Sequence, residues 1–107
     1  MKYWEEADLV ANALRDEGHE YWAQRLKQAG AGAVMGGELA GAYFALLVEI
    51  LDLPAVSGEA RSKAQQFFSR LSNDLYYGNE SHAAESVDYV RARIKQRRGQ
   101  PDPNLRQ

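Results

Sequence analysis

Hydrophobic residues recur through most of this chain at the spacing of three and four residues that is typical of an α-helix. Residues 39–51 (LAGAYFALLVEIL) are apolar almost all the way round such a helix, whereas every other periodic stretch is apolar along one stripe only. A helix that is apolar on every side is buried, and helices with one apolar stripe cover it. The pattern therefore predicts an all-α fold, a single compact bundle of about five helices around a central apolar helix at 39–51.

Capping residues predict where the first three helices end. The first helix has an apolar stripe from Tyr3 to Leu14, and Gly18 follows where a C-terminal cap is expected. The second helix comes next and is expected to end near Ala29, because each glycine in the segment 30–37 disfavours helix. The central helix is predicted to begin at residue 37 or 38 and to end before Pro54, which disfavours the helical conformation of the preceding residue.

Two further helices and a tail complete the predicted chain. Ser57 is expected to cap the fourth helix, which closes at Gly78, and residue 79 or 81 is expected to cap the fifth. The fifth helix has four apolar residues that are expected to face inward: Ala83, Val87, Val90 and Ile94. Short turns at residues 18 and 78 favour two antiparallel hairpins folded over the central helix. Residues 100–107 contain two prolines and one large apolar residue, which predicts a disordered tail after a single domain at 1–99.

Composition narrows the class of protein. With 107 residues, 45% of them hydrophobic, the chain has the size of one domain. The apolar run at 39–51 is too short to span a bilayer, and the acidic N-terminus does not resemble a secretory signal, so a cytoplasmic protein without a membrane partner is expected. The chain has no cysteine, which excludes disulfides and cysteine-bound zinc.

Two groups of residues invite a chemical interpretation. The glycines at 30, 32, 36 and 37 match no nucleotide-binding spacing, and Glu38 would repel a phosphate, so close helix packing explains them better. His19 and His82 each lie among acidic residues at a helix start, where solvated side chains are favoured over metal ligands that face a bundle core. No catalytic residue, metal or cofactor is predicted, and we expect a protein that is not an enzyme.

Charge is distributed unevenly along the chain. Residues 1–20 hold six acidic and two basic residues, whereas residues 91–107 hold six basic residues and one acidic residue. A basic last helix is one route to nucleic-acid binding. However, Arg91 and Arg98 flank one side of its apolar stripe, Arg93 and Arg97 flank the other, and the formal net charge of the chain is −2. A nucleic-acid partner is therefore less favoured than a protein partner.

The tyrosines give the most specific indication of a binding site. Tyr76 and Tyr77 fall roughly 130° to either side of the apolar stripe of the fourth helix, and Tyr89 is displaced about as far in the fifth. Such rings form either a second internal contact or a surface patch that binds protein. Two acidic residues lie beside the pair, and we predict a partner-binding site made of Asp74, Tyr76, Tyr77 and Glu80.

Two segments resemble known kinds of protein. The stretch from Gly18 to Leu51 is similar to a pattern found in small helical bacterial proteins of unassigned function, and NDLYYGN at 73–79 resembles small all-helical immunity proteins that neutralise bacterial toxins. The resemblance implies a bacterial cytosolic protein that binds and occludes another protein, such as a basic toxin domain. Two alternatives stay open: a self-associating structural domain that forms homodimers, and a nucleic-acid accessory protein that uses the basic last helix.

Overall fold

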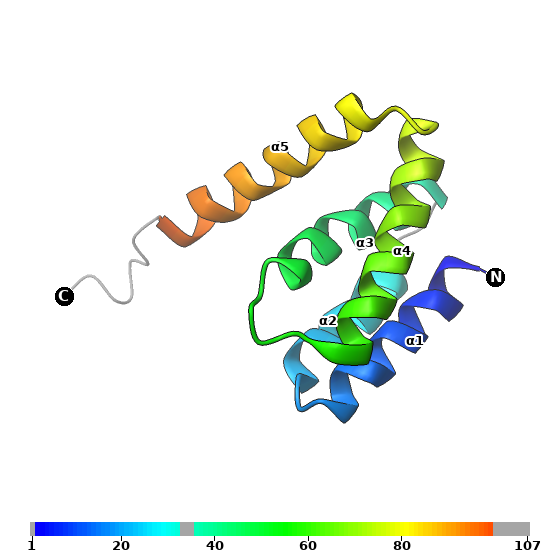
Figure 1. The fold of residues 1–107 in the computed structure, drawn as a ribbon, viewed down its shortest axis with the longest axis vertical. Helices are drawn as coiled ribbons and strands as arrows, with labels where there is room; N and C mark the ends of the chain where they lie inside the picture. Colours follow the sequence, from blue (N-terminus) through cyan, green and yellow to red (C-terminus); the bar gives the residue numbers. More distant parts are fainter. Residues whose placement is uncertain (1, 33–35, 100–107) are drawn as a thin grey trace.

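The structure, a computed structural model, describes residues 2–32 and 36–99, and these form five helices and no strand (Figure 1). The helices are α1 (Tyr3–Asp16), α2 (Glu20–Gly32), α3 (Gly36–Leu51), α4 (Gly58–Tyr76) and α5 (Glu80–Gly99). The predicted all-α fold is confirmed. The segment 100–107, which was predicted to be a disordered tail, lies outside the described residues.

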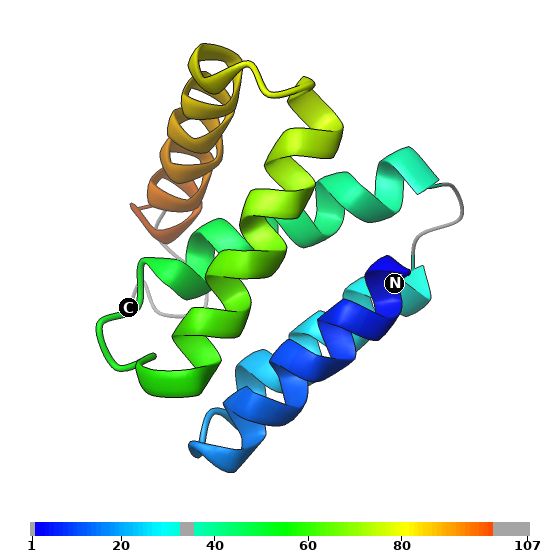
Figure 2. The same ribbon diagram turned by 45° about the vertical axis from the view of Figure 1, so that its right-hand side comes forward.

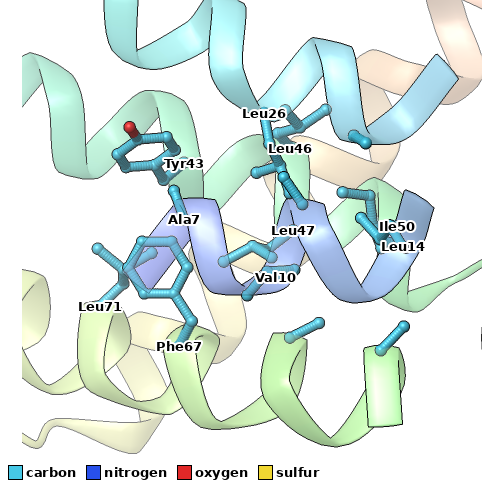
Figure 3. Close-up of a cluster of buried hydrophobic side chains, with 14 of the residues drawn as sticks. Ala7, Val10, Leu14, Leu26, Tyr43, Leu46, Leu47, Ile50, Phe67 and Leu71 are labelled. Carbon is cyan, nitrogen blue, oxygen red and sulfur yellow. The ribbon is translucent and has the colours of Figure 1, made fainter. Parts of the chain in front are cut away.

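The central position of α3 is also confirmed. It packs against each of the other four helices, and most of its residues from 43 to 51 are buried, including Tyr43, Leu47 and Ile50. Figure 3 shows side chains from α1, α2, α3 and α4 meeting in one apolar cluster. At its centre the ring of Phe67 lies 5.4 Å from that of Tyr43 and 6.4 Å from that of Tyr3. No helix in the described residues is long and apolar enough to cross a membrane.

The second helix is longer than predicted. Residues 30–32 remain helical instead of ending α2 near Ala29. The glycine at position 30 lies at a helix contact where a larger residue would not fit. A methyl group built on Gly30 would lie only 2.3 Å from the hydroxyl oxygen of the buried Tyr43. The glycine therefore lets α2 approach α3 closely. The packing interpretation is confirmed at this position, and the surroundings of residues 32–37 lie outside the described side chains.

Capping differs from the prediction at α4. Ser57 occupies the N-cap position, but its side chain makes no capping hydrogen bond. Instead the Glu17 carboxylate accepts a hydrogen bond of 2.9 Å from the backbone N–H of Ala60 in the first turn. Glu17 follows α1, so a long-range contact replaces the local cap and ties the α1–α2 turn to the start of α4. At α5, Asn79 does cap, since its Oδ1 accepts a 3.1 Å hydrogen bond from the His82 N–H.

Only one of the two predicted hairpins is present. The helices α1 and α2 lie side by side, whereas α4 packs mainly on α3 and α1 and has few contacts with α5 (Figure 2). The predicted second hairpin is therefore wrong. The stripe of α5 is only half-buried, because its small and β-branched residues offer a narrow apolar surface and its neighbours are charged. In both ribbon views α5 stands apart from α1 and α2.

Candidate protein-binding surfaces

The four predicted site residues gather where α4 ends and α5 begins. Asp74 and Tyr76 lie in the last turn of α4, Tyr77 is the C-cap residue, and Glu80 is the first residue of α5. We call these four residues the tyrosine corner. The structure brings them together because the turn between the two helices is short, as the glycine at position 78 predicted.

The two tyrosines of the corner have different surroundings. The ring of Tyr76 is partly buried and lies 5.5 Å from the ring of Phe44 on α3, in an edge-on arrangement. Phe44 also stacks on Phe68 at 5.0 Å, so Tyr76 extends an internal aromatic cluster. Tyr77 is 93% exposed. Of the two interpretations left open by the sequence, internal contact holds for Tyr76 and surface exposure for Tyr77.

The backbone of Tyr77 is unusual for a residue of its size. Its φ of 53° and ψ of 37° place it in the left-handed region, and it is the one non-glycine residue with positive φ among the described residues. Glycine or asparagine is the usual choice there, because a Cβ atom in this conformation costs about 1–2 kcal/mol. The left-handed residue ends α4, and the exposed ring of Tyr77 buries little surface in the fold.

The carboxylates of the corner are not equivalent. Asp74 accepts a 2.6 Å hydrogen bond from the hydroxyl of Tyr3, and this bond raises the pKa of Tyr3. The guanidinium of Arg70 lies 3.9 Å from Asp74 and also pairs with Glu6 on α1. Glu80 is exposed and has no ion pair with the described residues. Asp74 is thus engaged within the protein, and Glu80 supplies the uncompensated charge of the corner.

A shallow hollow of about 390 Å³ adjoins the corner between α4 and α5. Its lining residues belong to the second half of α4, the turn and the first turn of α5: Phe68, Ser69, Ser72, Asn73, Gly78, Asn79, Glu80 and Ala83. The Ser72 hydroxyl oxygen is buried and has no hydrogen-bond partner among the described residues. Tyr77 itself does not line the hollow, but Gly78 and Glu80 on the same turn do, so the hollow borders the turn that carries the exposed ring.

Sequence reasoning missed a larger groove between α2, α3 and α5. It has a volume of about 800 Å³. We call it the arginine groove, because an arginine from α2 and two from α5 line it. Its lining residues are Arg25, Gln28, Ala29, Ala42, Ala45, Leu46, Glu49, Tyr89, Val90, Arg93, Ile94, Gln96 and Arg97. No local pattern signals this groove, since its two walls lie more than sixty residues apart in the sequence.

One carboxylate is buried at the edge of the arginine groove. Glu49 is only 6% exposed although it belongs to the apolar helix α3. Its oxygens lie 3.2 Å from Arg97 of α5 and 3.9 Å from Arg25 of α2. Burial of a carboxylate is costly unless it is paired, so Glu49 fixes both walls of the groove to its floor. The nearby Arg91 forms a two-pronged ion pair with Asp52, at 2.8 and 3.0 Å, which also raises the pKa of Arg91.

Each rim of the groove carries an arginine beside aromatic rings. The guanidinium of Arg25 lies 5.8 Å from the ring centre of Tyr21 and 5.5 Å from that of Trp22. Across the groove, Arg93 lies 5.8 Å from the ring of Tyr89 and donates a 3.1 Å hydrogen bond to its hydroxyl, which raises the pKa of Arg93. Tyr21 and Tyr89 are each 62% exposed. Tyrosine and arginine are the residues that dominate protein interfaces.

The histidine clusters of the sequence do not converge. His19 is half-buried just before α2, and His82 is exposed in the first turn of α5. Within residues 2–32 and 36–99, no three histidine or acidic side chains lie close enough together to hold a metal ion.

Comparison with known proteins adds no relative to this picture. The chain matches no family model, no curated protein and no solved structure.

Proposed function

We propose that this chain is a non-enzymatic protein-binding module of the immunity type, which binds and occludes a bacterial toxin domain through the tyrosine corner. The observation that carries the proposal is Tyr77. A large aromatic ring is 93% exposed in a backbone conformation that favours glycine, so the ring buries little surface within the chain while its backbone is strained. Functional sites are where such costs are found.

The chemistry around Tyr77 supports a protein partner. A stiff amphipathic ring beside a hollow provides an anchor that a partner can bury, and the free charge of Glu80 favours a partner with a basic surface. The likeness of residues 73–79 to immunity proteins supports a toxin as that partner. The arginines of α5 support a nucleic-acid partner less well. Arg91 is already paired with Asp52, just after α3, and Arg97 is paired with Glu49 of α3.

The test separates the cost of Tyr77 to the fold from its contribution to binding. The partner is first isolated from a lysate of the source organism by crosslinking to the intact chain, and its affinity is then measured for variants. Tyr77→Gly should raise the free energy of unfolding by up to about 1 kcal/mol, because it removes the left-handed strain. The same change should weaken the complex by at least about 2 kcal/mol, the level of an interface hot spot.

Trp4→Ala is the control, since it removes an exposed aromatic ring of α1 that lines neither the hollow beside the corner nor the arginine groove. It should leave the affinity of the complex unchanged. Tyr76 is not a suitable test residue, because its ring packs on Phe44 and its loss would disturb the fold. A stable Tyr77→Gly variant that binds the partner as tightly as the natural chain would refute the assignment.

A further inference from the structure

We propose that the arginine groove is a second binding surface, and that it receives an amphipathic helix with acidic side chains from a partner protein. This inference does not depend on the tyrosine corner. It follows from the shape of the groove, the residues of its floor and the sign of its charge.

The groove lies where one further helix could pack between α2 and α5. The helices α2 and α5 both pack on α3, but they do not pack on one another in the described residues. The floor between them is one stripe of α3, made of Ala42, Ala45, Leu46 and Glu49 at helical spacing. This stripe is roughly 10 Å long, which corresponds to about two helical turns. A helix laid on it would complete the layer that α2 and α5 leave open.

The floor residues favour close approach of such a helix. Ala42 and Ala45 are small and half-buried, so they leave room above α3. Leu46 lies beside them, and Val90 and Ile94 add apolar surface from the wall formed by α5. Leucine or phenylalanine side chains at three- and four-residue spacing on the incoming helix would be buried here.

The positive charge of the groove favours an incoming helix with acidic side chains. Three arginines line the groove against the single carboxylate of Glu49, which leaves a formal excess of two positive charges. Arg93 in particular has only the neutral hydroxyl of Tyr89 as its hydrogen-bond partner, and no carboxylate of the described residues pairs with it. Acidic residues flanking the apolar stripe of a helix would meet these guanidinium groups, whereas basic residues would be repelled.

The experiment uses the full chain and two synthetic peptides of roughly 18 residues, five turns of helix. Both peptides share the same leucine stripe; one carries glutamates beside it, and the other carries lysines at the same positions. Fluorescence anisotropy at low salt should give an affinity at least about tenfold higher for the acidic peptide, and added salt should weaken it.

Two variants and a control locate the binding site. Arg93→Glu should weaken the acidic peptide at least about tenfold, the size expected for one lost charged contact. Ala45→Leu should also weaken it, because the larger side chain fills the floor. Lys95→Glu makes the same change of charge on α5 but at a residue that does not line the groove. At roughly 0.15 M ionic strength, where exposed charges more than about 8 Å apart are largely screened, it should change the affinity by less than about twofold. Thermal unfolding of each variant verifies that the fold is kept.

Several results would overturn the proposal. If the two peptides bind equally or neither binds, the groove does not select an acidic helix. If Arg93→Glu and Lys95→Glu weaken binding equally, the groove is not the binding site. A duplex DNA oligonucleotide that binds as tightly as the acidic peptide, with no effect of Ala45→Leu, would identify a general surface for polyanions. Sedimentation tests a second copy of the chain as the occupant. Self-association that is abolished both by the acidic peptide and by Arg93→Glu would show that another copy of the chain fills the groove. None of these results depends on Tyr77. A result that refutes binding at the arginine groove therefore leaves the proposal for the tyrosine corner untouched, and the reverse also holds.

Discussion

The body formed by α1 to α4 and the helix α5 are held by different forces. Each helix of the body contributes side chains to the buried cluster, among them Leu14, Leu26, Leu47 and Phe67. In contrast, α5 has no fully buried side chain among its described residues, and its apolar stripe is only half-covered. The body is stabilised by burial of apolar surface, whereas α5 is docked by a partial stripe and by ion pairs at the C-terminal end of α3.

The difference explains where the two proposed binding surfaces lie. The ion pairs Arg91–Asp52 and Arg97–Glu49 attach α5 near the C-terminal end of α3. The tyrosine corner is the turn by which α5 leaves the body, and the arginine groove is the space that its divergence opens. A weakly buried element next to a rigid one is also where local opening is expected. Both proposed binding surfaces thus lie where α5 meets the body, and neither lies within the buried cluster.

The largest expected effect comes from the body. Phe67→Ala should lower the free energy of unfolding by about 3–5 kcal/mol, because it removes a fully buried ring and leaves a cavity beside Tyr43. Urea denaturation followed by circular dichroism measures this change. A loss below about 1 kcal/mol would show that the cluster of Figure 3 is not the main source of stability.

Gly30→Ala tests the close contact between α2 and α3. The added methyl group would lie 2.3 Å from the Tyr43 hydroxyl. The resulting overpacking should lower the free energy of unfolding by about 1–3 kcal/mol. This loss exceeds the stabilisation expected from the higher helix propensity of alanine. Gly41→Ala is the matched control, since that helical glycine has no atom within 4 Å of the added methyl group. It should stabilise the protein by about 0.5–1 kcal/mol. Equal effects of both changes in thermal unfolding would contradict this packing.

Arg97→Gln should act on α5 and spare the body. It removes the 3.2 Å ion pair with the buried Glu49, and because Arg97 is largely exposed the expected loss is only about 1 kcal/mol. Amide hydrogen exchange in α5 should become faster, while exchange in α1 and α3 stays the same. Lys95→Gln, at a residue with no ion pair to the described residues, should change neither. Uniform acceleration across all helices would mean that α5 is not a separate unit.

Val90→Ala should give the smallest effect. Val90 belongs to the half-buried stripe of α5, so its truncation should lower the free energy of unfolding by less than about 1 kcal/mol. The same chemical change at Val10, which is 1% exposed in α1, should cost more in the same denaturation experiment. The reverse order would show that α5 is packed as firmly as the body.

Much of the body could be predicted from the sequence, because its determinants are local. A nearly continuous apolar run gives the buried helix α3, and Gly18 with φ of +90° ends α1 as its position suggested. The end of α2 was missed because the need for Gly30 comes from Tyr43, on another helix. The cap of α4 was missed for the same reason, since Glu17 supplies it from 43 residues away.

The candidate sites depended more on tertiary structure. The sequence located the tyrosine corner, but helical periodicity put Tyr76 and Tyr77 equally far from the stripe and did not separate them. Their different surroundings follow from Phe44 of α3, whose ring packs against that of Tyr76, whereas Tyr77 is exposed. No local pattern indicates the ion pairs of Glu49, because its partners are 24 and 48 residues distant. Only the divergence of α5 creates the groove in which it lies.

Native-state hydrogen exchange of the natural chain, resolved by residue, tests most directly whether α5 is docked on a separately stable body. If it is, the amides of α5 should exchange through a local opening whose free energy lies clearly below that of global unfolding, while the slowest amides of α1, α3 and α4 reach the global value. If the slowest amides of α5 instead exchange with the same free energy as those of the body, and respond equally to denaturant, then the five helices unfold as one unit and the division between body and α5 is wrong.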